Sequence, residues 1–191
     1  YNDFIKKFID LENKKPISFE VVSDTLEEME RDARKINAFK GNIYIKIPIT
    51  NSLGETTLPL IKKLLLERFK LNVTAILTET QMIELINILE KDDDVIISYF
   101  AGRVADTGRD PVVVIKKINQ IIKDKDLSAT KTLWASPREV LNIYQANDAG
   151  VDIITVTKEL IKKLELHKKN LQDYSLEIAK MFLNDAKKNN L

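Results

Sequence analysis

Strand-like and helix-like segments alternate along this chain of 191 residues, at a spacing of roughly 20 to 30 residues. The pattern predicts strands over Ile17–Val22, Ile43–Ile47, Asn72–Leu77, Val95–Phe100, Thr132–Ala135 and Asp152–Thr155. After each strand comes a charged stretch whose apolar residues recur with helical spacing, as at Leu58, Ile61, Leu64, Leu65 and Phe69. Because alternating strands and helices of this length form βαβ units, the sequence predicts an α/β fold with a parallel sheet.

Helix-start and helix-stop residues lie at several of the junctions. Thr78-x-x-Gln81 and Ser136-x-x-Glu139 have the spacing of capping boxes directly after strands. Gly150 lies where a C′ glycine would end a helix before the last strand. We therefore expect helices to begin just after Thr78 and Ser136.

The chain contains neither a G-x-G-x-x-G sequence nor a Walker loop, which argues against a nucleotide-binding sheet. We predict a (β/α)8 TIM barrel seen without its first one or two βα units, because such barrels usually have about 250 residues. Residues 1–191 are expected to form a single barrel domain, with a C-terminal helix from about residue 172. The apolar face of that helix could pack on its own domain or on a second subunit, so a homo-oligomer is one possible assembly.

Composition narrows the classes of partner. The formal net charge is only +1, with acidic and basic residues interspersed, so no bulk field favours nucleic acid or an anionic membrane. There is no cysteine, and no apolar run approaches the roughly 18 residues needed to span a bilayer. We expect a cytoplasmic protein with no nucleic-acid or membrane partner, no metal and no other cofactor.

Lys46 is a charged residue in the middle of the apolar segment Ile43–Thr50. Side chains alternate along a strand, so Ile43, Ile45 and Ile47 share one face while Tyr44 and Lys46 share the other. Removing an ammonium group from water favours its neutral form, and a neutral amine can form a Schiff base with a carbonyl. The alternative is an edge strand whose lysine points into solvent.

The same alternation places other polar residues on the face of Lys46, namely Ser18, Glu20, Asn72, Thr74, Ser98 and Ser136. Phe100 and Trp134 share that face, although Trp134 could fill the core rather than line a pocket. Arg103 follows in the next loop, and Arg138 lies at the start of the following helix. Barrel active sites draw on the C-terminal ends of several strands. This coincidence favours an interior position for Lys46 over a solvated one.

Each of these residues also has a purely structural explanation. Glu20 could simply pair with the lysine, Thr74 is a common strand residue, and Ser136 could act only as a helix cap. Arg138 at a helix start would oppose the helix dipole unless an anion bound there. For Arg103 and Arg138, phosphate binding and a structural salt bridge both remain open.

Several sequence segments resemble the transaldolase family in order and spacing. They are I-S-F-E-V with Glu20, I-K-I-P-I-T with Lys46, L-N-V-T-A with Thr74, S-Y-F-A-G-R with Phe100 and Arg103, and A-S-P-R with Arg138. The match extends from about Pro16 to the end of the chain.

The resemblance implies a Schiff-base enzyme of the pentose phosphate pathway that moves a dihydroxyacetone unit between phosphorylated sugars. Lys46 would attack the ketone of sedoheptulose 7-phosphate or fructose 6-phosphate, and glyceraldehyde 3-phosphate or erythrose 4-phosphate would accept the unit. Glu20 and Thr74 would hold the water that relays protons. The implied substrate and phosphate contacts are Asn72, Ser98, Phe100, Arg103, Ser136 and Arg138.

Two departures from the family pattern bear on activity. The family carries an aspartate and an asparagine on two strands that would precede Tyr1, and Tyr99 stands where proline is frequent. Related fructose 6-phosphate aldolases tend to carry tyrosine at the position of Phe100, so phenylalanine favours transfer over simple cleavage. The alternatives are an aldolase of that kind and a non-catalytic barrel that only binds sugar phosphates.

Overall fold

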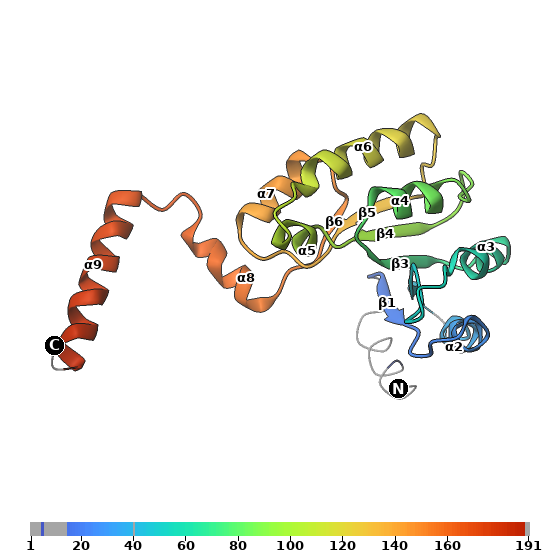
Figure 1. The fold of residues 1–191 in the computed structure, drawn as a ribbon, viewed down its shortest axis with the longest axis horizontal. Helices are drawn as coiled ribbons and strands as arrows, with labels where there is room; N and C mark the ends of the chain where they lie inside the picture. Colours follow the sequence, from blue (N-terminus) through green and yellow to red (C-terminus); the bar gives the residue numbers. More distant parts are fainter. Residues whose placement is uncertain (1–4, 6–14, 40, 190–191) are drawn as a thin grey trace. The chain divides into compact units, whose positions relative to one another are not determined.

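The computed structural model describes residue 5, residues 15–39 and residues 41–189, which divide into one compact unit up to Thr155 and a second from Val156 (Figure 1). The strands of the first unit are β1 Ile17–Glu20, β2 Ile43–Pro48, β3 Leu71–Ile76, β4 Val95–Tyr99, β5 Lys131–Trp134 and β6 Ile153–Ile154. Its helices are α2 Leu26–Asn37, α3 Leu58–Leu66, α4 Glu79–Ile86, α5 Ala101–Asp106, α6 Pro111–Asp124 and α7 Leu141–Asp148.

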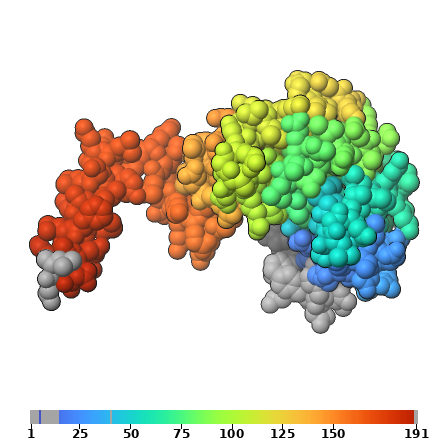
Figure 2. Space-filling view, viewed as in Figure 1, coloured from blue at the N-terminus to red at the C-terminus, as the bar shows by residue number. Residues whose placement is uncertain are grey.

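The described strands form one parallel sheet in the order β1 to β6, each strand pairing with the next along the chain. Apolar side chains on one face of this sheet, such as Phe19, Ile45 and Val73, form a single core with the helices outside it. In the space-filling view, residues of these helices form much of the visible surface of the first unit, from α2 in blue to α6 in yellow (Figure 2). The prediction of a parallel α/β fold is confirmed.

The sheet is strongly curled toward its other face. Asn72 on β3 donates a hydrogen bond of 2.9 Å to Ser18 on β1, across the intervening strand β2. Strands two apart in a flat sheet lie roughly 9.5 Å from each other, so these side chains can meet only inside a concave surface. The described strands form a curled half-barrel, and closure by further strands into eight remains a prediction.

The predicted helix start at Ser136 is wrong. Helix α7 begins only at Leu141, and Ser136 adopts a left-handed backbone conformation with φ of 56°. The side-chain oxygen of Asn142 accepts from the backbone N–H groups of Arg138 and Glu139, at 2.7 and 3.2 Å. Asn142 thus provides a hydrogen-bond partner for backbone groups that precede the helix, and Arg138 lies in the loop before α7.

The capping box at Thr78 and the glycine stop at Gly150 are confirmed. The Thr78 hydroxyl accepts from the backbone of Gln81, whose side chain in turn accepts from the Thr78 N–H. Gly150 follows the end of α7 with φ of 73°, a conformation in which the absence of Cβ avoids strain.

The predicted inward orientation of Trp134 is also wrong. Trp134 is fully buried in the outer core, while Leu133 and Ala135 belong to the inner apolar cluster with Tyr44 and Ile96. The space between sheet and helices takes the large indole, and the smaller neighbours turn inward. Because Ser136 has a left-handed backbone, its own side chain points to the inner face, as that of Ala135 does.

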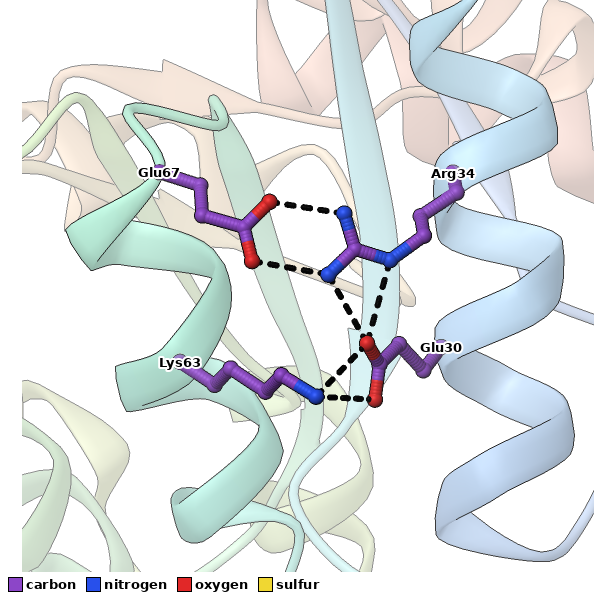
Figure 3. A network of polar contacts seen from close by, with 4 residues as sticks. All are labelled: Glu30, Arg34, Lys63 and Glu67. Carbon is purple, nitrogen blue, oxygen red and sulfur yellow. Dashed lines mark hydrogen bonds and ion pairs between the residues drawn. The ribbon is translucent and has the colours of Figure 1, made fainter.

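Helices α2 and α3 are joined by four charged side chains on their exposed surfaces (Figure 3). The guanidinium of Arg34 donates to both oxygens of Glu67 at 2.7 Å and to Glu30 at 2.8 Å. Lys63 Nζ lies 2.8 Å from Glu30. The network fixes two adjacent helices against each other on the outside of the half-barrel.

The second unit contains α8 Lys158–Lys163, a short 3-10 helix Leu164–Leu166 and α9 Leu171–Lys188. Several large apolar side chains of α9 are exposed within this unit, among them Leu176, Phe182 and Leu183. Within the described ranges, no helix combines the length and the apolar character needed to cross a membrane.

Candidate active site

A cavity of about 330 Å³ lies on the concave face of the sheet, near the carboxyl ends of the strands. The predicted site residues that line it are Lys46, Asn72, Thr74, Ser98, Phe100 and Ser136. Ser18, Leu133, Ala135 and Thr155 complete the lining. The cavity is therefore polar where the strands end and apolar along β5.

Lys46 lines this cavity and is paired with Glu20, which is not part of the lining. They are partners in the parallel register of β1 and β2, and Lys46 Nζ donates to Glu20 Oε2 at 3.2 Å. The Lys46 side chain retains 29% of its exposure and Glu20 retains 50%. Since β2 lies between β1 and β3, Lys46 is on an interior strand of the sheet rather than on an edge.

Asn72 is held by two serines on the concave face. Ser98 Oγ donates to Asn72 Oδ1 at 2.6 Å, and Asn72 Nδ2 donates to Ser18 Oγ at 2.9 Å. Ser98 and Asn72 are both buried. Because the two ends of the amide have different partners, its orientation is defined next to Lys46, its register partner on β2.

The hydroxyl of Thr74 is buried against the cavity without a hydrogen-bond partner in the described part of the chain. A bulge follows it, where Ala75 adopts φ of 58° and the register of β3 against β4 shifts. The bulge turns Ile76 into the outer core, so Thr74 is the last residue of β3 on the cavity side. A buried hydroxyl with no protein partner is suited to bind a water or a substrate oxygen.

Arg103 and Arg138 do not line the cavity and are exposed. Arg103 lies within α5 rather than in a loop, and its guanidinium stands 5.4 Å from the centre of the Phe100 ring. Arg138 forms an ion pair of 2.8 Å with Asp106, at the end of the same helix. Both arginines are thus placed around α5, beside the residue pair Phe100 and Ser136 that the cavity contains.

Gly102 allows α5 to approach the loop after β5. A Cβ atom at Gly102 would lie 1.6 Å from the carbonyl oxygen of Ser136, and the Gly102 N–H donates to the carbonyl of Ala135 at 3.2 Å. The close backbone contact brings the segment that carries Arg103 against the segment that carries Ser136 and Arg138.

Tyr44 lies on the same face of the sheet as Lys46, in an apolar cluster with two residues of the cavity lining, Leu133 and Ala135. Its ring packs with Ile96 and Leu133, and its hydroxyl donates to Asp94 at 2.6 Å. Burial, and then the hydrogen bond to the Asp94 carboxylate, raise the pKa of Tyr44, so the phenol stays protonated. The alternation rule had placed Tyr44 on this face, but nothing in the sequence indicated its partner.

Sequence reasoning gave no role to Ser18 and did not find Leu133, Ala135 or Thr155. The strand alternation that identified Glu20 also identifies Ser18, so that signal was present. On β5 the prediction placed Trp134 inward, so Leu133 and Ala135 were assigned to the opposite face from the one they occupy. Thr155 follows a strand of only two residues, which is too short to show a periodicity.

Similar proteins align with nearly the whole chain. A family model described as Transaldolase/Fructose-6-phosphate aldolase matches residues 2–191. A "Probable transaldolase" of Thermoplasma volcanium is 30% identical over 188 residues, covering 98% of this chain and 78% of the relative. One of Thermoplasma acidophilum is 32% identical over 188 residues with the same coverage, and one of Caldicellulosiruptor saccharolyticus is 32% identical over 173 residues, covering 91% of this chain and 74% of the relative.

Among solved structures, one described as "Native KDPGal structure" aligns with 92% of this chain and 96% of its own, at 11% identity and a TM-score of 0.29. The family model, in contrast, spans nearly every residue. The chain belongs to the transaldolase/fructose-6-phosphate aldolase family, a family of enzymes.

Proposed function

We propose that this protein is a transaldolase that transfers a dihydroxyacetone unit between phosphorylated sugars through a Schiff base on Lys46. The observation that carries the proposal is the pairing of Lys46 with Glu20 at 3.2 Å beside a cavity lined by amide and hydroxyl groups. An amine next to a carboxylate has a nearby group that can take its proton before attack.

In the proposed reaction, the Lys46 amine adds to the ketone carbon of the donor sugar. The resulting carbinolamine loses water, and the iminium that forms at C2 of the sugar accepts the electron pair of the C3–C4 bond when that bond breaks. As the bond breaks, the hydroxyl of the departing aldose phosphate loses its proton and becomes the aldehyde carbonyl. The enamine left on Lys46 then adds to the aldehyde of an acceptor, and water releases the product.

Glu20 and Thr74 would serve the proton transfers of these steps. Glu20 is within hydrogen-bond distance of the reacting nitrogen, and the Thr74 hydroxyl has no other partner among the described residues. A water held on Thr74 could carry a proton between the carboxylate and the sugar hydroxyl. General acid–base help of this kind contributes about 10² to 10⁴ in rate.

Asn72, Ser98 and Ser136 offer the polar contacts for the sugar chain, and Arg103 and Arg138 offer charge for the phosphate. Arginine forks suit phosphate oxygens because they can donate two parallel hydrogen bonds. Arg138 is paired with Asp106, and both side chains are half exposed. A phosphate would compete with that carboxylate for the guanidinium.

Fructose 6-phosphate cleavage to free dihydroxyacetone is the second candidate, because the matching family contains both activities in its description. Phe100 favours transfer, since its ring lines the cavity and has no hydroxyl to place a protonating water near the enamine. An aldolase would release dihydroxyacetone without an acceptor, whereas a transaldolase would hold the unit until an aldose arrives.

The test is a two-substrate assay on the full chain. With fructose 6-phosphate and erythrose 4-phosphate, we expect sedoheptulose 7-phosphate and glyceraldehyde 3-phosphate, and little free dihydroxyacetone when erythrose 4-phosphate is omitted. Free dihydroxyacetone at equal rates with and without acceptor would support the aldolase. No product with either mixture, from folded protein, would support a barrel that only binds sugar phosphates.

A further inference from the structure

A second cavity lies in the first unit on the other face of β4, between the sheet and helices α4, α5 and α6. Its volume is about 420 Å³, within the range of small-molecule sites. Tyr99 lines it, while the neighbouring residues Ser98 and Phe100 line the cavity of Lys46. The two cavities share no lining residue, so a single strand separates them.

The side chain of Tyr99 is only 1% exposed, and its hydroxyl has no hydrogen-bond partner among the described residues. A phenol that lines a cavity and has no protein partner can donate its hydrogen bond to a molecule that enters the cavity. Burial, with the nearby carboxylates of Glu79 and Asp110, raises the pKa of Tyr99 to about 12. The phenol is therefore protonated at neutral pH and can donate.

The walls beside Tyr99 are apolar. Leu77, Val104 and Val114 contribute aliphatic side chains from the end of β3, from α5 and from α6. Leu77 is 41% exposed, although it directly follows a buried strand. A ligand with an apolar body would cover this side chain and gain the free energy of its burial.

The two carboxylates at the rim of the cavity already have partners within the protein. Glu79 pairs with Lys117, and Asp110 caps α6 by accepting from the Val112 N–H at 2.9 Å. Arg109 is engaged with the hydroxyl of Thr107 at 2.8 Å. Because Lys117 and Arg109 offset the two carboxylates, the rim has no excess positive charge with which to hold the phosphorylated sugars of the first cavity.

We propose that this cavity is a second binding site, specific for a small uncharged molecule with a ring-sized apolar body and an acceptor oxygen that receives the hydrogen bond of Tyr99. The site is independent of Lys46 and of the proposed transfer reaction. Tyr99 is the residue that defines it, since it supplies both an aromatic wall and a hydroxyl donor that forms no hydrogen bond with a described residue.

Benzamide and benzoate are matched probes for this site, because they have the same ring and differ in charge. We expect benzamide to shift the backbone amide resonances of residues 77–79 and 107–114 of the ¹⁵N-labelled full chain in a saturable way. Benzoate should leave them unchanged. Fructose 6-phosphate should not displace benzamide, since its proposed site is on the other side of β4.

Two variants test the contacts. Tyr99→Phe keeps the ring and removes the hydroxyl, so benzamide affinity should fall about fivefold, the effect of one neutral hydrogen bond. Leu77→Trp at the exposed mouth should fill the cavity and abolish the shifts. The proposal is overturned by equal binding of benzamide and benzoate, by unchanged affinity in both variants, or by shifts that map to Lys46 and Asn72 instead.

Discussion

Arg138 and Asp106 form an ion pair of 2.8 Å between the loop after β5 and the end of α5, and each side chain is half exposed. Exposed pairs of this kind contribute little to stability. The Arg138 guanidinium is therefore available to exchange Asp106 for a phosphate group of substrate.

Substitutions at Arg138 and at Asp106 should change the KM for fructose 6-phosphate in opposite directions. Arg138→Ala should raise it about tenfold or more, because a charge-assisted hydrogen bond is lost. Asp106→Asn should lower it, since the competing carboxylate becomes neutral. Arg31→Ala, an exposed arginine on α2, is the control and should leave KM unchanged. A KM that is equal in all four proteins would remove Arg138 from the phosphate site.

Thr74→Val separates catalysis from stability. The substitution keeps the shape of the side chain and removes a buried hydroxyl that has no partner in the described residues. We expect the free energy of unfolding to stay the same or to rise slightly, while kcat falls about a hundredfold through loss of the positioned water. Urea unfolding and steady-state kinetics measure the two effects. Unchanged kcat would show that Thr74 serves only as a strand residue.

Gly102→Ala should disturb the site through the backbone. The new Cβ would lie 1.6 Å from the Ser136 carbonyl oxygen, and neither segment can yield without moving Ser136 and Arg138. We expect a loss of about 2 kcal/mol or more in unfolding free energy together with a raised KM. Gly108→Ala is the control, because its φ is 80° and a Cβ added there would have no atom within 4 Å. That variant should show only backbone strain of about 1 kcal/mol, and equal losses in the two variants would refute the steric account.

The network between α2 and α3 should make stability depend on pH. Hydrogen bonds from Lys63 and then Arg34 lower the pKa of Glu30, and the hydrogen bond from Arg34 lowers the pKa of Glu67. Both carboxylates have lower pKa values folded than unfolded, so their contribution is complete at neutral pH. It is lost as the pH falls below about 4.3 and through the folded values.

Arg34→Met removes the shared cation while keeping most of its aliphatic stem. The difference in urea midpoint between wild type and this variant should be larger at pH 7 than at pH 3, and smaller in high salt. Arg31→Met, whose partner Glu28 lies outside the network, should show no such change with pH. A difference that is constant with pH would contradict the coupling of Glu30 and Glu67 to Arg34.

The inner face of the half-barrel was predictable from strand alternation alone wherever a strand is regular. Alternation placed Lys46, Asn72 and Ser98 on one face, because each lies within an uninterrupted strand segment. The rule failed on β5, where Trp134 packs outward and the left-handed Ser136 returns inward. Leu133 and Trp134 are adjacent and both apolar, so β5 lacks the polar and apolar alternation that distinguishes the two faces of β1, a strand of the same length.

Tertiary contacts account for the rest. The sequence Ser136-Pro137 is a good helix start locally, but the approach of Gly102 and the side chain of Asn142 shape this loop instead. The pairing of Arg138 with Asp106, and of Asn72 with Ser18 across β2, depends on the curl of the sheet. Contacts of that kind leave no periodic pattern along the chain.

Borohydride trapping tests the role of Lys46 most directly. Folded protein is incubated with fructose 6-phosphate, reduced with borohydride, digested and analysed by mass spectrometry, with Lys46→Arg and Lys70→Arg as matched variants. A stable three-carbon adduct on Lys46 that persists in Lys70→Arg and vanishes in Lys46→Arg is the predicted result. An adduct on another lysine would contradict Schiff-base chemistry at Lys46. So would the absence of any adduct in protein that converts fructose 6-phosphate and erythrose 4-phosphate.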